Sequence, residues 1–79
     1  ASKHLKLFPN PFYNYATLKI DEQLHISGVE LLNITGQLIR TLDYQVGNEI
    51  IIHRGNLNSG IYFLRVRADN TYVIKLVLE

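Results

Sequence analysis

The last third of the chain holds two alternating apolar runs, and residues 61–78 read IYFLRVRADNTYVIKLVL. In the first run Tyr62, Leu64 and Val66 fall on one face of an extended chain, and the arginines beside them fall on the other. The second run repeats the pattern, with Lys75 opposite its apolar face. Alternation with period two predicts antiparallel strands that bury one face, and the Asp-Asn pair between the runs predicts a turn. This stretch therefore predicts a β-hairpin and places the chain in the all-β class.

The same alternation recurs in the earlier part of the chain. Ala16, Leu18 and Ile20 share one face of an extended segment, and Ile50 and Ile52 share a face of another. Glycine and asparagine, which tolerate positive φ, separate these segments at short intervals. We expect about seven strands, at residues 5–8, 15–20, 29–33, 38–43, 49–53, 61–68 and 71–78.

Short strands with turn signals between them predict an immunoglobulin-like antiparallel β-sandwich. The Cys and Trp hallmarks of true immunoglobulin domains are missing, so only the architecture is predicted. Helix competes poorly. Residues 21–26 (DEQLHI) would start one turn, and Ser27-Gly28 would stop it before it reached a stable length.

Length and composition predict one domain over residues 1–79. A chain of this size buries only about 60% of the surface that its unfolded form exposes, so its core is thin. The net charge is +1 and the basic residues do not cluster, which argues against nucleic-acid binding. There is no cysteine, so disulfides and thiolate metal sites are excluded.

Membrane and targeting segments are also absent from the sequence. No apolar run approaches the length of a membrane span, and no cationic and then apolar leader precedes the first strand. We therefore expect the chain to be an excised piece of a larger protein, and an exported parent would carry its leader far upstream.

Histidine and serine offer no catalytic or metal site in this sequence. His4, His25 and His53 lie on three different segments without a neighbouring ligand, whereas zinc sites need three or four protein ligands. Ser59 lies in Asn-Ser-Gly and lacks the G-x-S-x-G elbow of serine hydrolases. We expect no metal, no cofactor and surface positions for the histidines.

The carboxylates have the distribution of solubilising surface charge. Asp21 and Glu22 are adjacent, and the others at turns or strand ends are Asp43, Glu49 and Asp69. Glycosidase chemistry needs two carboxyl groups facing each other across a cleft, and so small a sandwich has little room for one. We therefore expect that the protein is not an enzyme.

Three tyrosines keep a carbohydrate-binding alternative open. Tyr13, Tyr15 and Tyr44 are expected at the surface, where sugar rings stack on aromatic side chains. They are equally explained as strand formers or as covers on a thin core. A binding pocket requires aromatic and polar groups that converge, and the sequence shows no such convergence.

Pro9-Asn10-Pro11-Phe12 forms a stiff elbow after the first strand. Each proline fixes its own φ and keeps the preceding residue extended. Phe8 and Phe12 flank the elbow, and we expect both to pin it to the core.

Four segments taken together resemble the type A C-terminal sorting domain of the bacterial type IX secretion system. The first is Pro9 to Phe12, and the second is the hairpin at residues 29–39 with its turn glycine, Gly36. The third consists of Leu57, Gly60 and Tyr62, and the last consists of Lys75, Leu76, Val77 and Leu78. The match spans nearly the whole chain, in order and at suitable spacing.

Two positions depart from the family's pattern. Asn33 stands where aspartate is frequent before the turn glycine, a tolerable change in a residue that caps a turn. The chain reads Leu78-Glu79 where a lysine or arginine often closes the last strand. If the export channel reads a terminal positive charge, this domain is expected to be a weaker substrate.

The resemblance implies that the domain is an export address for an upstream cargo domain of the same chain. The cargo would cross the periplasm, and an outer-membrane translocon would recognise the domain and release the protein at the cell surface or outside. A sortase-like transpeptidase would then remove the domain. Recognition is expected on the exposed faces of the final hairpin, residues 61–79, with edge pairing to a partner strand as one mode. The alternatives are an accessory carbohydrate- or protein-binding module of a secreted enzyme and a passive spacer. The exposed strand edges also leave a dimer open as a partner state.

Overall fold

The computed structural model describes residues 5–21, 24–42 and 48–79 and contains seven strands. Six of the seven predicted strands lie where expected, with ends shifted by at most one residue. The predicted end of the remaining strand, Asp43, lies outside the described residues. The strands are β1 (Leu5–Phe8), β2 (Tyr15–Ile20), β3 (Gly28–Leu32), β4 (Leu38–Leu42), β5 (Glu49–His53), β6 (Gly60–Arg67) and β7 (Thr71–Leu78).

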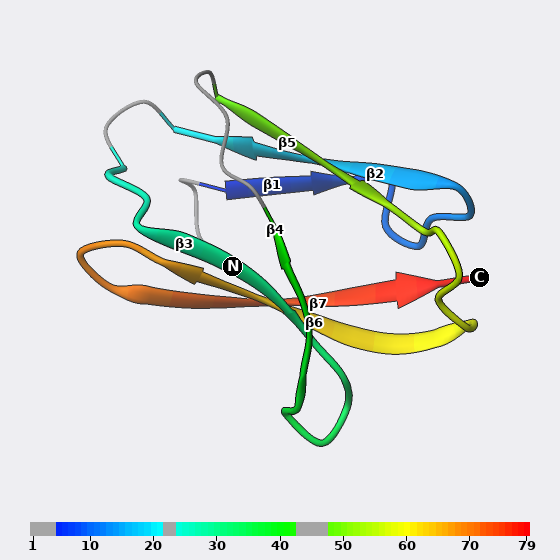
Figure 1. The fold of residues 1–79 in the computed structure, drawn as a ribbon. Coiled ribbons are helices and arrows are strands. Elements are labelled where there is room, and N and C mark those ends of the chain that lie inside the picture. The colour runs from blue at the N-terminus through cyan, green and yellow to red at the C-terminus, as the bar shows by residue number, and fades with distance from the viewer. Residues whose placement is uncertain (1–4, 22–23, 43–47) are drawn as a thin grey trace.

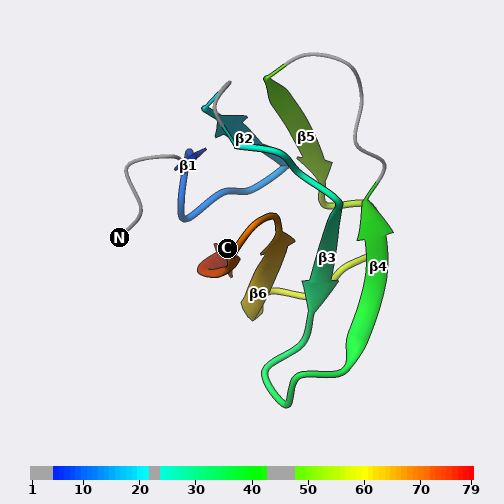
Figure 2. The same cartoon turned by 90° about the vertical axis from the view of Figure 1, so that its left-hand side faces the viewer.

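The strands form two antiparallel sheets packed face to face (Figures 1 and 2). One sheet has the order β1-β2-β5 and the other has the order β4-β3-β6-β7. This is the predicted immunoglobulin-like sandwich. It differs from the constant-type arrangement, in which the fourth strand lies beside the fifth, because a tight turn folds β4 back onto β3.

That turn explains why β3 ends before Asn33. The Asn33 side-chain oxygen accepts hydrogen bonds from the backbone N–H groups of Thr35 (3.0 Å) and Gln37 (2.9 Å). Gly36 has a φ of 89°, a left-handed conformation that disfavours other residues. The asparagine therefore caps the turn, as the resemblance to the family implies.

The core lies between the two sheets and is built from the predicted faces. The large side chains that are almost completely buried are Phe12, Leu18, Leu31, Ile52, Leu64, Leu76, Val29 and Val66. No polar side chain is buried among the described residues. Alternation along each strand thus selects the core face, while the charged residues remain on the outer faces.

No helix occurs in the described residues. This includes residues 21 and 24–26, the described part of the segment in which the sequence allowed one helical turn. There, the Leu24 N–H donates to the Asp21 carbonyl at 3.0 Å and makes a turn. The described residues also include no helix long and apolar enough to cross a membrane.

The β6–β7 hairpin is the longest element of the fold. Its two strands are each eight residues long and pair from Gly60 opposite Leu78 to Arg67 opposite Thr71. Because β7 is the last strand of its sheet, one of its edges has no neighbouring strand. The contacts along that edge define the candidate site.

Candidate functional site

The Pro-Asn-Pro-Phe segment (residues 9–12) takes the chain from β1 in one sheet to the free edge of β7 in the other. The Phe12 N–H donates to the Val77 carbonyl at 3.0 Å, and the Phe12 carbonyl accepts from the Glu79 N–H at 2.9 Å. Phe12 thereby forms a parallel bridge with Leu78, and its side chain is only 2% exposed. The peptide bonds before both prolines are cis. The elbow is therefore anchored to the last strand through Phe12.

Phe8 does not help to anchor the elbow, so this part of the prediction is wrong. Its side chain is 48% exposed. The cause is the alternation of β1, which turns Leu5 and Leu7 toward the interior and places Phe8 on the outer face. Only one of the two phenylalanines that flank the elbow is part of the core.

Asn10 also pairs with the free edge of β7, but through its side chain instead of its backbone. Its amide nitrogen donates to the Lys75 carbonyl at 2.9 Å, and its amide oxygen accepts from the Val77 N–H at 3.0 Å. A side-chain amide has the same donor and acceptor as a peptide group. Asn10 thus takes the place of one residue of a neighbouring strand, in a segment where proline removes backbone donors.

The third motif forms the turn that leads into β6. Leu57 packs against the core, and the Tyr62 hydroxyl donates to the Asn58 carbonyl at 2.8 Å. Gly60 has a φ of 147°, and a side chain there would meet no other atom within 4 Å. The glycine is therefore required by backbone conformation and not by lack of space.

One arginine joins these motifs. Arg54 follows β5, and its guanidinium donates to the Leu57 carbonyl (3.2 Å), the Ser59 hydroxyl (3.0 Å) and the Tyr13 carbonyl (3.1 Å). It also donates to the main-chain oxygen of Glu79. Five N–H donors in a rigid plane suit a site where several carbonyls meet. Arg54 therefore holds together the segment after the elbow, the turn before β6 and the end of β7.

Sequence reasoning missed Arg54. The guanidinium also lies over the Tyr13 ring, 5.3 Å from its centroid. The backbone N–H of Arg54 donates to the Asn14 carbonyl at 2.8 Å. The only signal in the sequence is its position between a strand and the Gly55-Asn56 turn. Its partners lie up to 41 positions away, so spacing along the chain does not reveal them.

The last motif is divided between the core and the outer surface. Leu76 and Leu78 are 0% and 2% exposed, whereas Lys75 is exposed and Val77 is half-buried. The backbone edge of this half of β7 is occupied by Asn10 and Phe12. Only the outward side chains of the motif are therefore available to a partner.

Comparison with known protein families identifies this combination of segments. The family model described as the secretion system C-terminal sorting domain matches residues 6–79. The chain belongs to this family. It is a C-terminal sorting domain of type IX secretion, as the resemblance predicts, and this family implies export of the attached protein to the cell surface or beyond. The chain matches none of the curated proteins and none of the solved structures with which it was compared.

The motifs of the sorting domain do not all meet. Segments 9–12, 57–62 and 75–78 are linked through β7 and Arg54. Within the described part of the chain, the hydrogen bonds of the turn at Gly36 stay within its own hairpin. It therefore shapes the β3–β4 hairpin and is not part of the linked set.

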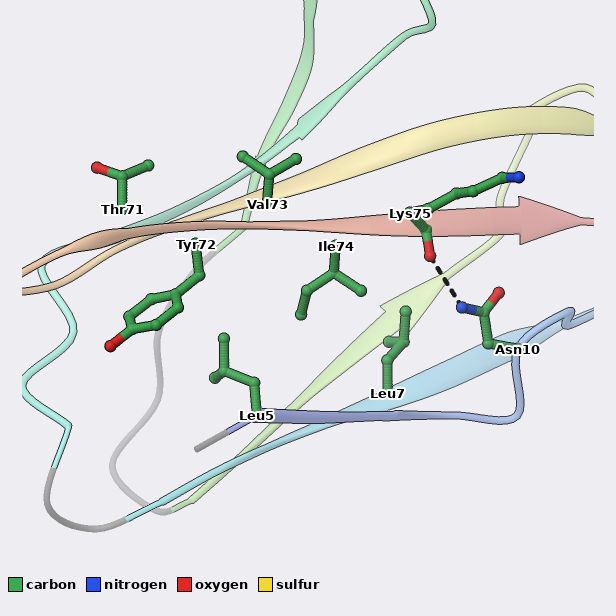
Figure 3. A pocket seen from close by; sticks show the side chains of 8 residues that line it. All are labelled: Leu5, Leu7, Asn10, Thr71, Tyr72, Val73, Ile74 and Lys75. Atoms are coloured by element: carbon green, nitrogen blue, oxygen red, sulfur yellow. Dashed lines mark hydrogen bonds between the residues drawn. The ribbon is translucent and has the colours of Figure 1, made fainter. Parts of the chain in front are cut away.

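A groove lies beside the other half of β7, between this strand and β1 (Figure 3). Leu5 and Leu7 point from β1 toward Tyr72 and Ile74 of β7. The space has a volume of about 520 Å³. The sorting domain thus has a covered half and an open half along one strand edge.

The histidines lie at the surface, as far as they are described. His25 and His53 are exposed, and His4 lies outside the described residues. The described residues contain no group of three or more histidine, cysteine, aspartate or glutamate side chains that could hold a metal.

The carboxylates of the sorting domain are scattered. Glu49 and Asp69 are exposed and Asp21 is half-buried, while Glu22 and Asp43 lie outside the described residues. Glu30, on the outer face of the larger sheet, accepts from the Nε atoms of Arg65 and Arg67, both at 2.9 Å. These hydrogen bonds hold the pKa of Glu30 below its usual value, and the bond from Arg65 contributes most.

Two of the three tyrosines considered for sugar binding are described and exposed. Tyr13 is 68% exposed and lies beneath the Arg54 guanidinium. Tyr15 is 54% exposed, and its ring lies 6.4 Å from that of His53 at a tilt of 43°. Tyr44 lies outside the described residues. The two rings have other partners within the domain, and the pocket described above is lined by neither.

Proposed function

We propose that the outer-membrane translocon of type IX secretion recognises this sorting domain as the export signal of an upstream cargo protein. The domain acts as ligand and substrate and has no catalytic activity of its own. The observation that supports this is that Arg54 bonds to Leu57 of the third motif and to Tyr13 and Glu79, which directly follow the first and the last motif. This linkage gives the last strand a fixed position and leaves its outward side chains exposed.

The proposal includes a route. The cargo and domain enter the periplasm together, cross the outer membrane and reach the surface, where a sortase-like transpeptidase removes the domain. Cleavage would then fall upstream of the folded part, since the described strands are tied into two sheets from Leu5 to Leu78.

Lys75 is the side chain of the last motif best suited to recognition. It is exposed on β7 and forms no ion pair with a described residue. Replacing the whole 75–79 segment would also remove Leu76 and Leu78 from the core, so any loss of export would be ambiguous. A single change at Lys75 avoids that problem.

A secretion assay tests the proposal. The chain is fused to the C-terminus of a fluorescent reporter with a signal peptide, in a type IX-competent bacterium and in a translocon-deficient sibling. We expect reporter outside the first strain and periplasmic retention in the second. Retention in both, with the domain folded and with a known sorting domain exported in the same host, would contradict the proposal and favour a binding module or spacer.

A matched pair of variants tests the role of Lys75. Lys75→Gln is expected to lower export, whereas Lys19→Gln, at an exposed lysine on β2, is expected to leave export unchanged. Equal export of both variants would exclude recognition of the Lys75 charge.

A further inference from the structure

The open half of the β7 edge has backbone groups that find no partner among the described residues. Lys75 and Val77 direct their carbonyls outward, to Asn10 and Phe12. Since residues of an edge strand alternate between inward and outward hydrogen bonding, Thr71 and Val73 face outward as well. No hydrogen bond to their outward groups, or to the Lys75 N–H, is found among the described residues. An edge of this kind is a template for another strand.

The groove supplies an apolar floor directly beside these groups. Leu5 and Leu7 line one side, and Tyr72 and Ile74 line the other (Figure 3). A small apolar ligand would fill the space and leave the edge unpaired. An extended polypeptide satisfies both features, because its backbone pairs with β7 while every second side chain enters the groove.

Charge limits the nature of that polypeptide. Lys6 and Lys75 are exposed on the two strands that border the groove, and residues 5–12 and 71–78 contain no acidic side chain. Neither lysine forms an ion pair with a described residue. A second copy of the chain would bring the same two lysines, whereas a strand with acidic residues complements them.

We infer that residues 71–75 of β7 and the adjoining groove bind an extended strand of the export machinery in which apolar and acidic residues alternate. This inference rests on the proposed function and specifies the recognition site. It places recognition upstream of the half of β7 that Asn10 and Phe12 cover.

Binding is tested on the isotope-labelled chain with a short synthetic peptide that alternates glutamate and valine. A peptide that alternates lysine and valine is the control. The acidic peptide is expected to shift the NMR resonances of Leu7, Tyr72 and Ile74 and to slow amide exchange at Val73. No shift with millimolar acidic peptide, or equal shifts with both peptides, would overturn the inference.

Val73→Pro removes one outward N–H without touching the β6–β7 ladder. Thr41→Pro is the matched control, because Thr41 is an exposed residue with an outward N–H on the other edge of the same sheet. With both variants folded by circular dichroism, Val73→Pro is expected to weaken peptide binding and reporter export about tenfold. Thr41→Pro is expected to leave both unchanged.

The export results separate the two proposals. If the unmodified domain is exported and Val73→Pro is exported equally well, the site assigned here is wrong and the sorting function stands. If the unmodified domain is not exported through the translocon, the sorting function itself fails. A Val73→Pro effect accompanied by a concentration-dependent dimer of the unmodified chain would overturn the inference in favour of a second copy.

Discussion

The two seams of the sandwich, where the edge strands of opposite sheets face each other, are closed in different ways. Between β4 and β5, Arg40 donates to the carbonyls of His53 (2.7 Å) and Arg54 (3.5 Å). Between β1 and β7, Asn10 and Phe12 pair with the strand edge itself, along only half of its length. In the described part of the chain, the hydrogen bonds across the first seam come from the side chain of Arg40. The second seam has a covered part and an open part.

Arg54 connects the two seams. Its carbonyl accepts from Arg40 at the first seam, and its guanidinium donates to Tyr13 and Glu79 at the second. The two seams should therefore respond differently to substitution. Changes at the closing contacts should affect stability, whereas changes at the open half of β7 should affect recognition.

The largest expected effect is at Phe12, which closes the second seam. Phe12→Ala removes a side chain that is 2% exposed and should lower the free energy of unfolding by about 3–5 kcal/mol. Phe8→Ala is the matched control, since that ring is 48% exposed, and it should cost less than about 1 kcal/mol. Urea unfolding followed by circular dichroism measures both. Similar losses for the two variants would contradict the assignment of Phe12 as the anchor.

The next effect is at Arg54. Arg54→Met keeps much of the apolar stem and removes the hydrogen bonds to Leu57, Tyr13 and Glu79, at a cost of about 2 kcal/mol. Arg54→Lys should recover less than half of that loss, because an ammonium group cannot reproduce the planar set of donors. Full recovery by lysine would show that charge alone matters at this position.

A smaller effect is expected at Asn10, whose side chain is exposed. Asn10→Asp retains an acceptor for the Val77 N–H but loses the donor to the Lys75 carbonyl. At neutral pH this should lower the free energy of unfolding by about 1 kcal/mol. The protonated acid can donate to the Lys75 carbonyl again. The deficit should therefore shrink as the pH falls toward about 4. A deficit independent of pH would argue against this hydrogen bond.

The smallest effect is at Glu30, on the outer face and away from both seams. The folded state lowers its pKa through the hydrogen bonds from Arg65 and Arg67. The resulting stability is present above the pKa of the unfolded chain and is lost as the pH falls through the lower pKa of the folded chain. Glu30→Gln should therefore flatten the acid side of the stability profile and leave export unchanged. An NMR titration of the Glu30 carboxyl carbon checks the direction of the shift.

The sequence is sufficient for the strands and their buried faces. Alternation depends on neighbouring residues, so Leu64 and Val66 could be assigned to the core from β6 alone. The turn at Thr35-Gly36 is local as well and was predicted from the sequence, whereas the capping role of Asn33 came from the family's pattern.

The site required the folded chain. The partners of Asn10 lie 65 and 67 positions away, and those of Arg54 belong to three separate segments. Phe8 was misassigned although the alternation of β1 is a local signal, because its proximity to the elbow was given more weight than the inward position of Leu5 and Leu7. Local patterns determine which residues face inward, whereas contacts between sheets determine which motifs meet.

Native-state hydrogen exchange along β7 tests the division of this strand most directly. The Val77 and Glu79 amides donate to Asn10 and Phe12 and should be protected. The Val73 and Lys75 amides face outward and should exchange at least about tenfold faster. This pattern would confirm a covered half beside an open half. Equal protection of Val73 and Val77 would contradict it and remove the basis for strand pairing at residues 71–75.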